Sequence, residues 1–135
     1  MTTFSNESLG LSGTTACGDG DTHQFHFVEA AGTAKRVSIA TGASGPAPIG
    51  VMQNDPRSGE AANVIYVGGT QVYADGSTAI VYGDFITSGS DGQAVKASGS
   101  TVHGQALEAL ASGASVLIEA VLFGVGQSAI IENTP

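Results

Sequence analysis

The side chains of this 135-residue chain that can do acid–base, nucleophilic or metal chemistry are few and scattered. Histidine occurs three times, at His23, His26 and His103. A metal site needs ligands that converge on one point. On a strand, His23 and His26 would point to opposite faces because they are three positions apart, and His103 is remote in the sequence. We therefore expect no metal site and no cofactor.

Two carboxylates stand at alternate positions in the segment Asp19-Gly20-Asp21, as they do at the start of calcium loops. Calcium needs six or more oxygen ligands, and no glutamate follows at the usual distance. We interpret this segment as a solvated turn.

Nucleophilic catalysis would need a serine or cysteine beside a base and an orienting acid. No serine lies in a Gly-x-Ser-x-Gly pattern, and Cys17 has no recognisable partner. Glu108 and Glu119 alternate with apolar residues, which is typical of a solvated face. The glycine clusters lack the Lys-Ser/Thr ending of a phosphate loop. The sequence thus predicts a protein that presents a surface and is not an enzyme.

The charge balance is strongly acidic, with 12 Asp and Glu against 4 Lys and Arg and a net charge of -8. Only Lys35 and Arg36 are adjacent bases, so we expect no direct contact with nucleic acid, which requires clustered cations. One cysteine excludes an internal disulfide and favours a reducing cell interior. We expect no signal peptide and no membrane span, since no segment has the required apolar length.

Short apolar runs interrupted by glycine fill the chain from Ile49 to Phe123. The breaks at Gly68-Gly69, Asp75-Gly76, Gly89, Asp91-Gly92 and Gly113 are typical of tight turns between strands. The pattern predicts a mainly β fold: a compact small β-barrel, or a β-tulip-like or sandwich body, with at most one or two short helices. We find no exact internal repeat.

Three regions follow from composition. Residues 1–22 are rich in Ser, Thr and Gly and predict an extended N-terminal arm, which gains order only by lying on its own body or on a neighbouring protein. Phe4, Leu9 and Leu11 would be its anchors. Residues 23–126 form the expected β-rich domain, and residues 127–135 form a C-terminal tail.

The sequence predicts the secondary structure of four segments of the domain. The first strand is expected over His23–Glu29, with Phe25 and Phe27 on one face. The second covers Lys35–Ala40, with Val37 and Ile39 inward. Gly104–Ser112 has helical spacing of its leucines and fits either a short helix or a strand that leads into a turn. Ser115–Phe123 is apolar on both faces, which predicts a central or subunit-contacting strand.

The order of these elements resembles the capsid cement, or head decoration, proteins of tailed bacteriophages. The segments that carry the resemblance are Ile49-Gly-Val-Met, Gly68-Gly-Thr-Gln-Val-Tyr, Ala79-Ile-Val-Tyr-Gly-Asp-Phe-Ile, Gly92-Gln-Ala-Val-Lys-Ala, Gly104-Gln-Ala-Leu-Glu-Ala and Gly113-Ala-Ser-Val-Leu-Ile-Glu-Ala-Val-Leu-Phe.

The resemblance implies a homotrimeric virion protein that is made in the bacterial cytoplasm and binds the outer surface of an expanded icosahedral head. There it would clamp the major capsid protein against the pressure of packaged DNA. Under this hypothesis the arm, through Thr2, Thr3, Phe4, Leu9 and Leu11, adds to the shell, since strand addition needs few particular side chains. The candidate trimer interface on the last strand consists of Val116, Ile118, Val121 and Phe123.

Two other functions stay open. A virion-surface adhesin would bind host glycans through exposed Tyr66, Tyr73 or Tyr82. A hydrolytic enzyme ranks third, because no group of side chains in the sequence supports it.

Overall fold

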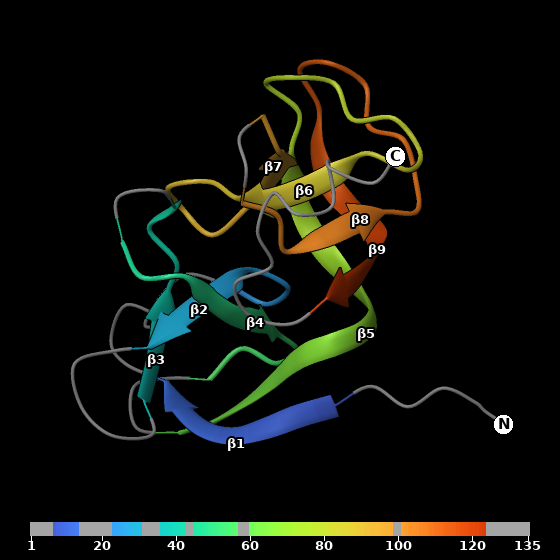
Figure 1. The fold of residues 1–135 in the computed structure, drawn as a ribbon. Helices are drawn as coiled ribbons and strands as arrows, with labels where there is room; N and C mark the ends of the chain where they lie inside the picture. Colours follow the sequence, from blue (N-terminus) through green and yellow to red (C-terminus); the bar gives the residue numbers. More distant parts are fainter. Residues whose placement is uncertain are drawn as a thin grey trace, which may run out of the picture.

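The computed structural model describes residues 7–13, 23–30, 36–42, 45–56, 60–98 and 101–123, with the backbone alone described for 7–13. These ranges contain nine strands and no α-helix, so the prediction of a mainly β fold is confirmed (Figure 1). The strands are β1 Glu7–Gly13, β2 Phe27–Ala30, β3 Arg36–Ile39, β4 Pro48–Met52, β5 Ala61–Asp75, β6 Phe85–Ser88, β7 Ala94–Lys96, β8 Gly104–Ala106 and β9 Ser115–Phe123.

Five of these strands close into a β-barrel, as the sequence predicts. The ring runs β5-β7-β6-β8-β9 and returns to β5, because β5 pairs with β9 along nine residues, from Val67↔Phe123 to Asp75↔Ser115. The remaining strands lie outside this barrel. Closure leaves these five strands without a long free edge, which is how small β proteins avoid unwanted pairing.

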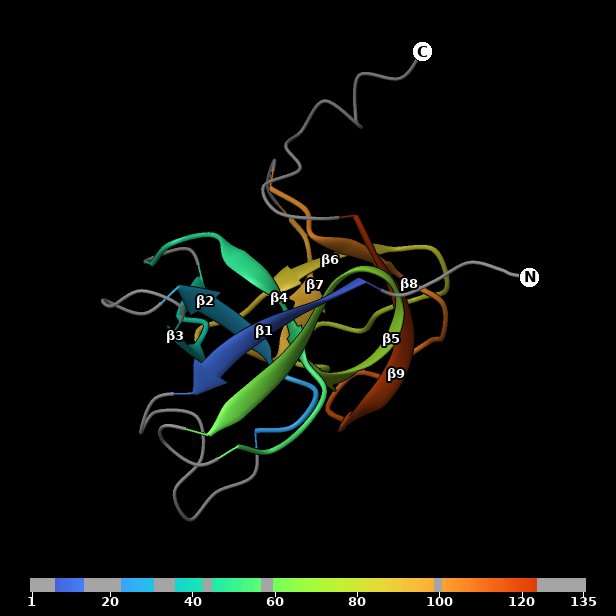
Figure 2. The same ribbon diagram turned by 90° about the horizontal axis from the view of Figure 1, so that it is seen from below.

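The outer strands form a second ring of pairings, in the order β1-β3-β2-β4 and then the first half of β5. Each ring has its own apolar core. The barrel core contains side chains with at most 1% exposure, including Ile80, Ile86 and Ile118, while the outer strands enclose Val28, Val37, Met52, Ala62 and Val64. Figure 2 shows β5 passing from one ring to the other.

The long strand β5 corrects one expectation from the sequence. Gly68 and Gly69 were expected to break the chain into two strands, but β5 continues through them for 15 residues. Gly68 has a φ of 108°, which a residue with a Cβ rarely adopts. A Cβ on Gly69 would meet no atom within 4 Å. The glycine pair therefore lets the strand bend where it passes between the two rings.

A second correction concerns the start of the domain. His23–Glu29 was expected to be one strand, but residues 23–26 form a turn and β2 begins at Phe27. Phe25 has a φ of 67°, so it cannot continue a strand. Its N–H donates to Met52 O (2.7 Å) and its carbonyl accepts from Tyr73 N–H (2.8 Å). These two bonds across the sheet hold the strained residue in place.

The other two segments agree with expectation. β3 covers Arg36–Ile39, with Val37 fully buried and Ile39 packed against the outer core. For Gly104–Ser112 the strand alternative is confirmed: β8 ends at Ala106 and a turn follows.

Two segments of the barrel, residues 74–86 and 104–116, repeat one backbone motif, and their hydrogen bonds match when the two copies are exchanged, which we call the internal twofold. Ile80 of the first copy and Leu110 of the second pair as an isolated antiparallel bridge. Each residue of the first copy lies thirty positions before its counterpart, and Gly83 (φ 92°) corresponds to Gly113 (φ 88°). Two pairs of backbone hydrogen bonds match. The bond from Gly83 N–H to Ala106 O (2.8 Å) corresponds to the bond from Gly113 N–H to Gly76 O (2.7 Å). The bond from Ala106 N–H to Asp84 O (2.8 Å) corresponds to the bond from Gly76 N–H to Ala114 O (2.7 Å).

Candidate functional site

The predicted shell-binding arm is only partly described. Thr2, Thr3 and Phe4 lie outside the described residues. Leu9 and Leu11 belong to β1, whose backbone pairs with β5 at Val64 and Ala62. The segment from Glu7 to Gly13 is therefore extended and is part of the protein's own sheet, which is one of the two arrangements open to the arm. Its contact with a shell stays a prediction.

The four candidate trimer residues of β9 do not share one surface. Val116 is 49% exposed, while Ile118 is 1% exposed and packs in the barrel core. Val121 and Phe123 are half-buried on the opposite face of the strand, where the Phe123 ring meets Phe85 at 6.1 Å between centroids. Ile118 therefore acts inside the chain, and only the other three side chains remain reachable by a second subunit.

An apolar turn stands at the end of the barrel where the chain passes from β5 to β6. Tyr82 is 73% exposed and Val81 is 56% exposed, and both precede Gly83. The Val81 N–H donates to Asp84 Oδ2 (2.9 Å), which fixes the turn. Leu107, 39% exposed, follows Ala106, whose carbonyl accepts the N–H of Gly83. Three exposed apolar side chains thus come from adjoining backbone in the β5–β6 and β8–β9 connections, which lie side by side at the upper right of Figure 1.

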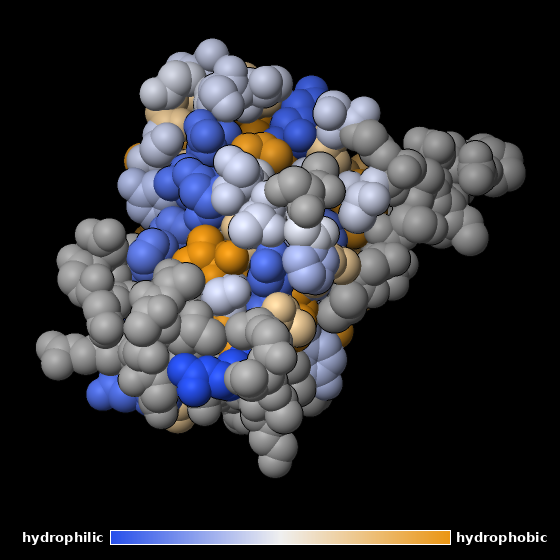
Figure 3. Space-filling model, turned by 90° about the vertical axis from the view of Figure 1, so that its left-hand side faces the viewer, coloured by the Kyte–Doolittle hydropathy of each residue, from blue (hydrophilic) through white to orange (hydrophobic). Residues whose placement is uncertain are grey.

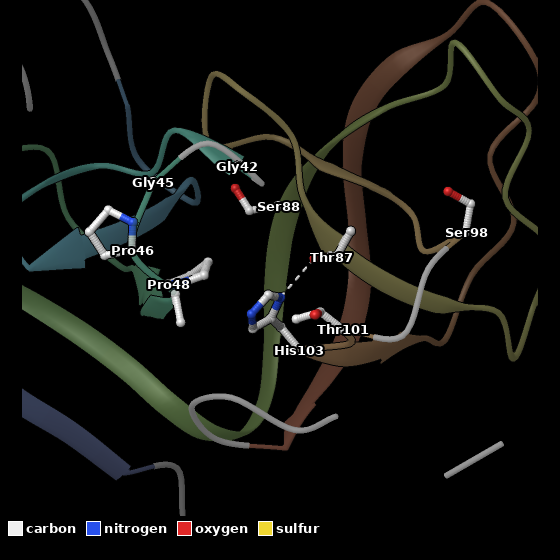
Figure 4. A pocket seen from close by; sticks show the side chains of 10 residues that line it. Gly42, Gly45, Pro46, Pro48, Thr87, Ser88, Ser98, Thr101 and His103 are labelled. Carbon is white, nitrogen blue, oxygen red and sulfur yellow. Dashed lines mark hydrogen bonds between the residues drawn. The ribbon is translucent and has the colours of Figure 1, made fainter. Parts of the chain in front are cut away.

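A pocket of about 440 Å³ lies where the barrel meets the loop between β3 and β4. One wall is the loop, with Gly42, Gly45, Pro46, Ala47 and Pro48. The other wall comes from β6 and from the segment that leads into β8, and consists of Thr87, Ser88, Ser98, Thr101 and His103. Figure 4 shows the two proline rings on one side and the hydroxyl groups and the imidazole on the other. None of these lining residues carries a formal charge at neutral pH.

His103 is the most constrained member of that wall. It is 5% exposed, and its Nδ1 lies 2.9 Å from Thr87 Oγ1, with which it shares a hydrogen bond. Its Nε2 is buried and has no partner among the described residues. Burial lowers the pKa of His103, so its ring is neutral at pH 7. The pocket therefore offers apolar ring faces and neutral hydrogen-bonding groups.

The other two histidines meet in the turn before β2. His23 and His26 have ring centroids 5.5 Å apart, so the expectation that they point to opposite faces is wrong. The cause is the turn at Phe25, which ends the alternation of a strand. The His26 ring also stacks on Tyr73 at 5.4 Å. Burial lowers the pKa of His26, with a smaller opposing effect of its hydrogen bond to the Gln24 carbonyl.

The remaining candidates for chemistry are separated or outside the described residues. Within the described ranges no three His, Cys, Asp or Glu side chains are placed to hold a metal ion. Cys17, Asp19 and Asp21 lie outside them. Glu108 and Glu119 are exposed, and the Glu108 carboxylate accepts a hydrogen bond from the backbone N–H of Glu119 (2.6 Å). That contact fixes the middle of β9 beside the turn after β8.

No protein-family model and no curated protein sequence matches this chain. Among solved structures, the chain is similar to the N base of the head fibre protein gp8.5 of bacteriophage phi29. The TM-score is 0.63 at 24% sequence identity, and the match covers 89% of this chain and 96% of the other. The two proteins share a fold. The part of the chain that the structure describes has no helix long and apolar enough to cross a membrane.

The three tyrosines that would serve an adhesin are spread over the molecule. Tyr66 lines a small cavity beside Phe27 and Pro48, and Tyr73 stacks on His26, so both are half-buried. Only Tyr82 is fully exposed. No ring contact joins any two of the three. The face in Figure 3 shows hydrophobic surface only as small separate patches among hydrophilic residues.

Two features of the site were not identified from the sequence. The two walls of the pocket, at Pro46 and at His103, are far apart in the sequence, so no local sequence pattern predicts the pocket. The apolar turn could have been recognised from the sequence, because Tyr82 lies directly before Gly83 in a turn, where polar residues usually predominate.

Proposed function

We propose that this chain is a bacteriophage head protein that decorates the outside of the capsid. In this proposal a homotrimer binds the outer surface of the expanded icosahedral head and contacts the major capsid protein. It stabilises the shell against the pressure of packaged DNA and carries out no reaction. It is made in the bacterial cytoplasm and ends on the outer surface of the virion.

The observation that carries the proposal is the fold shared with the phi29 head fibre N base over nearly the full length of both chains. Fold alone does not fix function, so the surface must agree as well. A net charge of -8 suits a protein that works outside the shell, since it repels nucleic acid and keeps the free protein soluble. The closed barrel, in which every strand is hydrogen-bonded to two neighbours, suits a role under mechanical load.

The proposed shell contact is the N-terminal segment from Thr2 to Leu11. The pairings of Glu7 to Leu11 in the described structure are all with β5, on one side of β1. Within the described ranges no strand pairs with the other side of these residues, and in this proposal a shell strand joins that side through main-chain hydrogen bonds. Three such contacts in a trimer would strengthen one another through effective concentration.

Sedimentation with purified heads tests this proposal. The full-length protein is mixed with expanded empty heads and, in parallel, with unexpanded heads of the virus that encodes it. We expect saturable binding to the expanded heads and a higher temperature of head disruption. Absence of binding at micromolar protein concentration would refute the decoration function, and binding to host cells in place of heads would support an adhesin.

A further inference from the structure

The internal twofold provides a control for the apolar turn. The turn Val81-Tyr82-Gly83 has as its counterpart Ala111-Ser112-Gly113, which forms the same backbone bonds with small or polar side chains. Leu107 likewise corresponds to Ser77. The fold therefore does not need large apolar side chains at this position. Their exposure costs solubility without a folding benefit, which is typical of a contact surface.

The chemistry of the pocket fits a phenol side chain. Pro46 and Pro48 present aliphatic ring faces on which an aromatic ring can pack, and Thr87 and Ser88 present hydroxyl groups that can pair with a phenolic O–H. Among the residues that the structure describes, none that lines the pocket is charged, although the chain has 12 acidic residues. A neutral aromatic group can thus enter without burying an unpaired charge.

Tyr82 cannot fill the pocket of its own chain. It precedes β6, whereas Thr87 and Ser88 of the pocket wall lie at the far end of that strand. A strand rises about 3.3 Å per residue, so β6 alone, from Phe85 to Ser88, places roughly 10 Å of extended backbone between the turn and the far end of the pocket wall. The turn and the pocket of one molecule are therefore held apart by a fixed element.

We propose that the Val81-Tyr82 turn of one copy inserts into the proline- and hydroxyl-lined pocket of a second copy, in a head-to-tail contact. Because the two surfaces differ, the contact is heterologous, and in this proposal three successive contacts complete one full turn and close a ring. This inference deepens the homotrimer of the proposed function and rests on it. In a closed trimer every turn and every pocket is filled, and ring closure supplies the affinity that one small contact lacks.

Loss of the turn tests the contact. The double substitution Val81→Ala with Tyr82→Ser gives the first turn the residues of the second, so the fold should be retained. Light scattering of the full-length chain should show a trimer for the wild type and association weakened by about 30-fold or more for the variant. Ser112→Ala is the matched control and should leave the trimer intact. Ala47→Phe, which fills the pocket, should weaken association as the turn variant does.

Directed disulfides test the geometry. In a Cys17→Ser background, three samples are oxidised: the Tyr82→Cys variant alone, the Ser98→Cys variant alone, and an equal mixture of the two. We expect cross-linked dimers only in the mixture, because the contact joins different surfaces. Cross-linking of Tyr82→Cys with itself, a wild-type monomer at 0.1 mM (about the upper working range), or an unaffected trimer in the double variant would each overturn this proposal. Head binding by the same samples, measured separately, shows whether the decoration function survives loss of the head-to-tail contact.

Discussion

Ile80 and Leu110 form a reciprocal pair between the β5–β6 and β8–β9 connections: the Ile80 N–H donates to Leu110 O (2.9 Å) and the Leu110 N–H donates to Ile80 O (2.7 Å). They occupy equivalent places in the two copies of the backbone motif and are 1% and 4% exposed. The pair therefore joins the two copies of the motif by main-chain bonds and by side-chain packing.

Truncation of either residue should destabilise the fold by about 2–5 kcal/mol, because each deletion leaves a cavity in a closed barrel. Ile80→Ala and Leu110→Ala should have similar effects, as their positions are equivalent. The sum of the two single losses in unfolding free energy should differ from the loss in the double variant, because both side chains line one core. Urea unfolding monitored by circular dichroism checks this, with Ser112→Ala as a surface control that should change stability by less than about 0.5 kcal/mol.

Glycine substitutions should separate steric from conformational demands. At Gly83 an added Cβ meets nothing closer than 4.0 Å, so Gly83→Ala should cost only the strain of a positive φ, about 1 kcal/mol. At Gly76 an added Cβ would lie 2.6 Å from Ala114 O and 2.7 Å from Ala111 O, on backbone that cannot yield easily. Gly76→Ala should therefore lower the unfolding midpoint far more. Equal effects of the two substitutions would contradict the described turn geometry.

Acidification should destabilise the protein through two histidines. Burial lowers the pKa of His26 and of His103, so the unfolded chain takes up protons at a higher pH than the folded one. Stability should be constant above the unfolded histidine pKa, about 6.5, and should fall as the pH drops below it. Near His26 the charged neighbours are His23 and Asp91, of which His23 opposes its protonation and Asp91 favours it.

Thermal melts between pH 7.5 and 5 measure this dependence. His103→Gln keeps a polar group beside Thr87 and removes the titration, so its melting temperature should fall less steeply with pH than that of the wild type. If the variant keeps the full pH dependence, the loss of stability arises elsewhere, for example from carboxylates.

Two nested deletions should divide the N-terminal segment by role. Removal of residues 1–6 leaves β1 in place, so we expect unchanged thermal stability and weaker binding to heads. Removal of residues 1–11 also deletes most of β1 and its pairing with β5, and should lower the melting temperature as well. Full head affinity in the shorter deletion, measured by sedimentation, would show that residues 1–6 are not the shell contact.

The strands could be read from the sequence where alternation and β-branched residues agree. Ser115–Phe123 and Arg36–Ile39 are strands as expected, and glycine correctly marks the turns at Gly76, Gly92 and Gly113. Phe25 could not be predicted, because its positive φ depends on hydrogen bonds to Met52 and Tyr73, which are distant in the sequence.

Long-range geometry explains the remaining differences. Gly68 and Gly69 allow either a turn or a bend, and only the pairing of β5 with β9 on both sides of the glycines selects the bend. The internal twofold is carried by backbone bonds, and few of its equivalent residues are identical, as Tyr82 and Ser112 illustrate. The pocket depends on the approach of two loops, which no local pattern reports.

Electron microscopy of heads saturated with the protein tests the central claim most directly. The decoration function predicts added three-lobed density on the outer surface of expanded heads, at local threefold positions, into which the barrel fits with β1 nearest the shell. A map of expanded heads that is unchanged by saturating protein would contradict it, as would density at a unique vertex only.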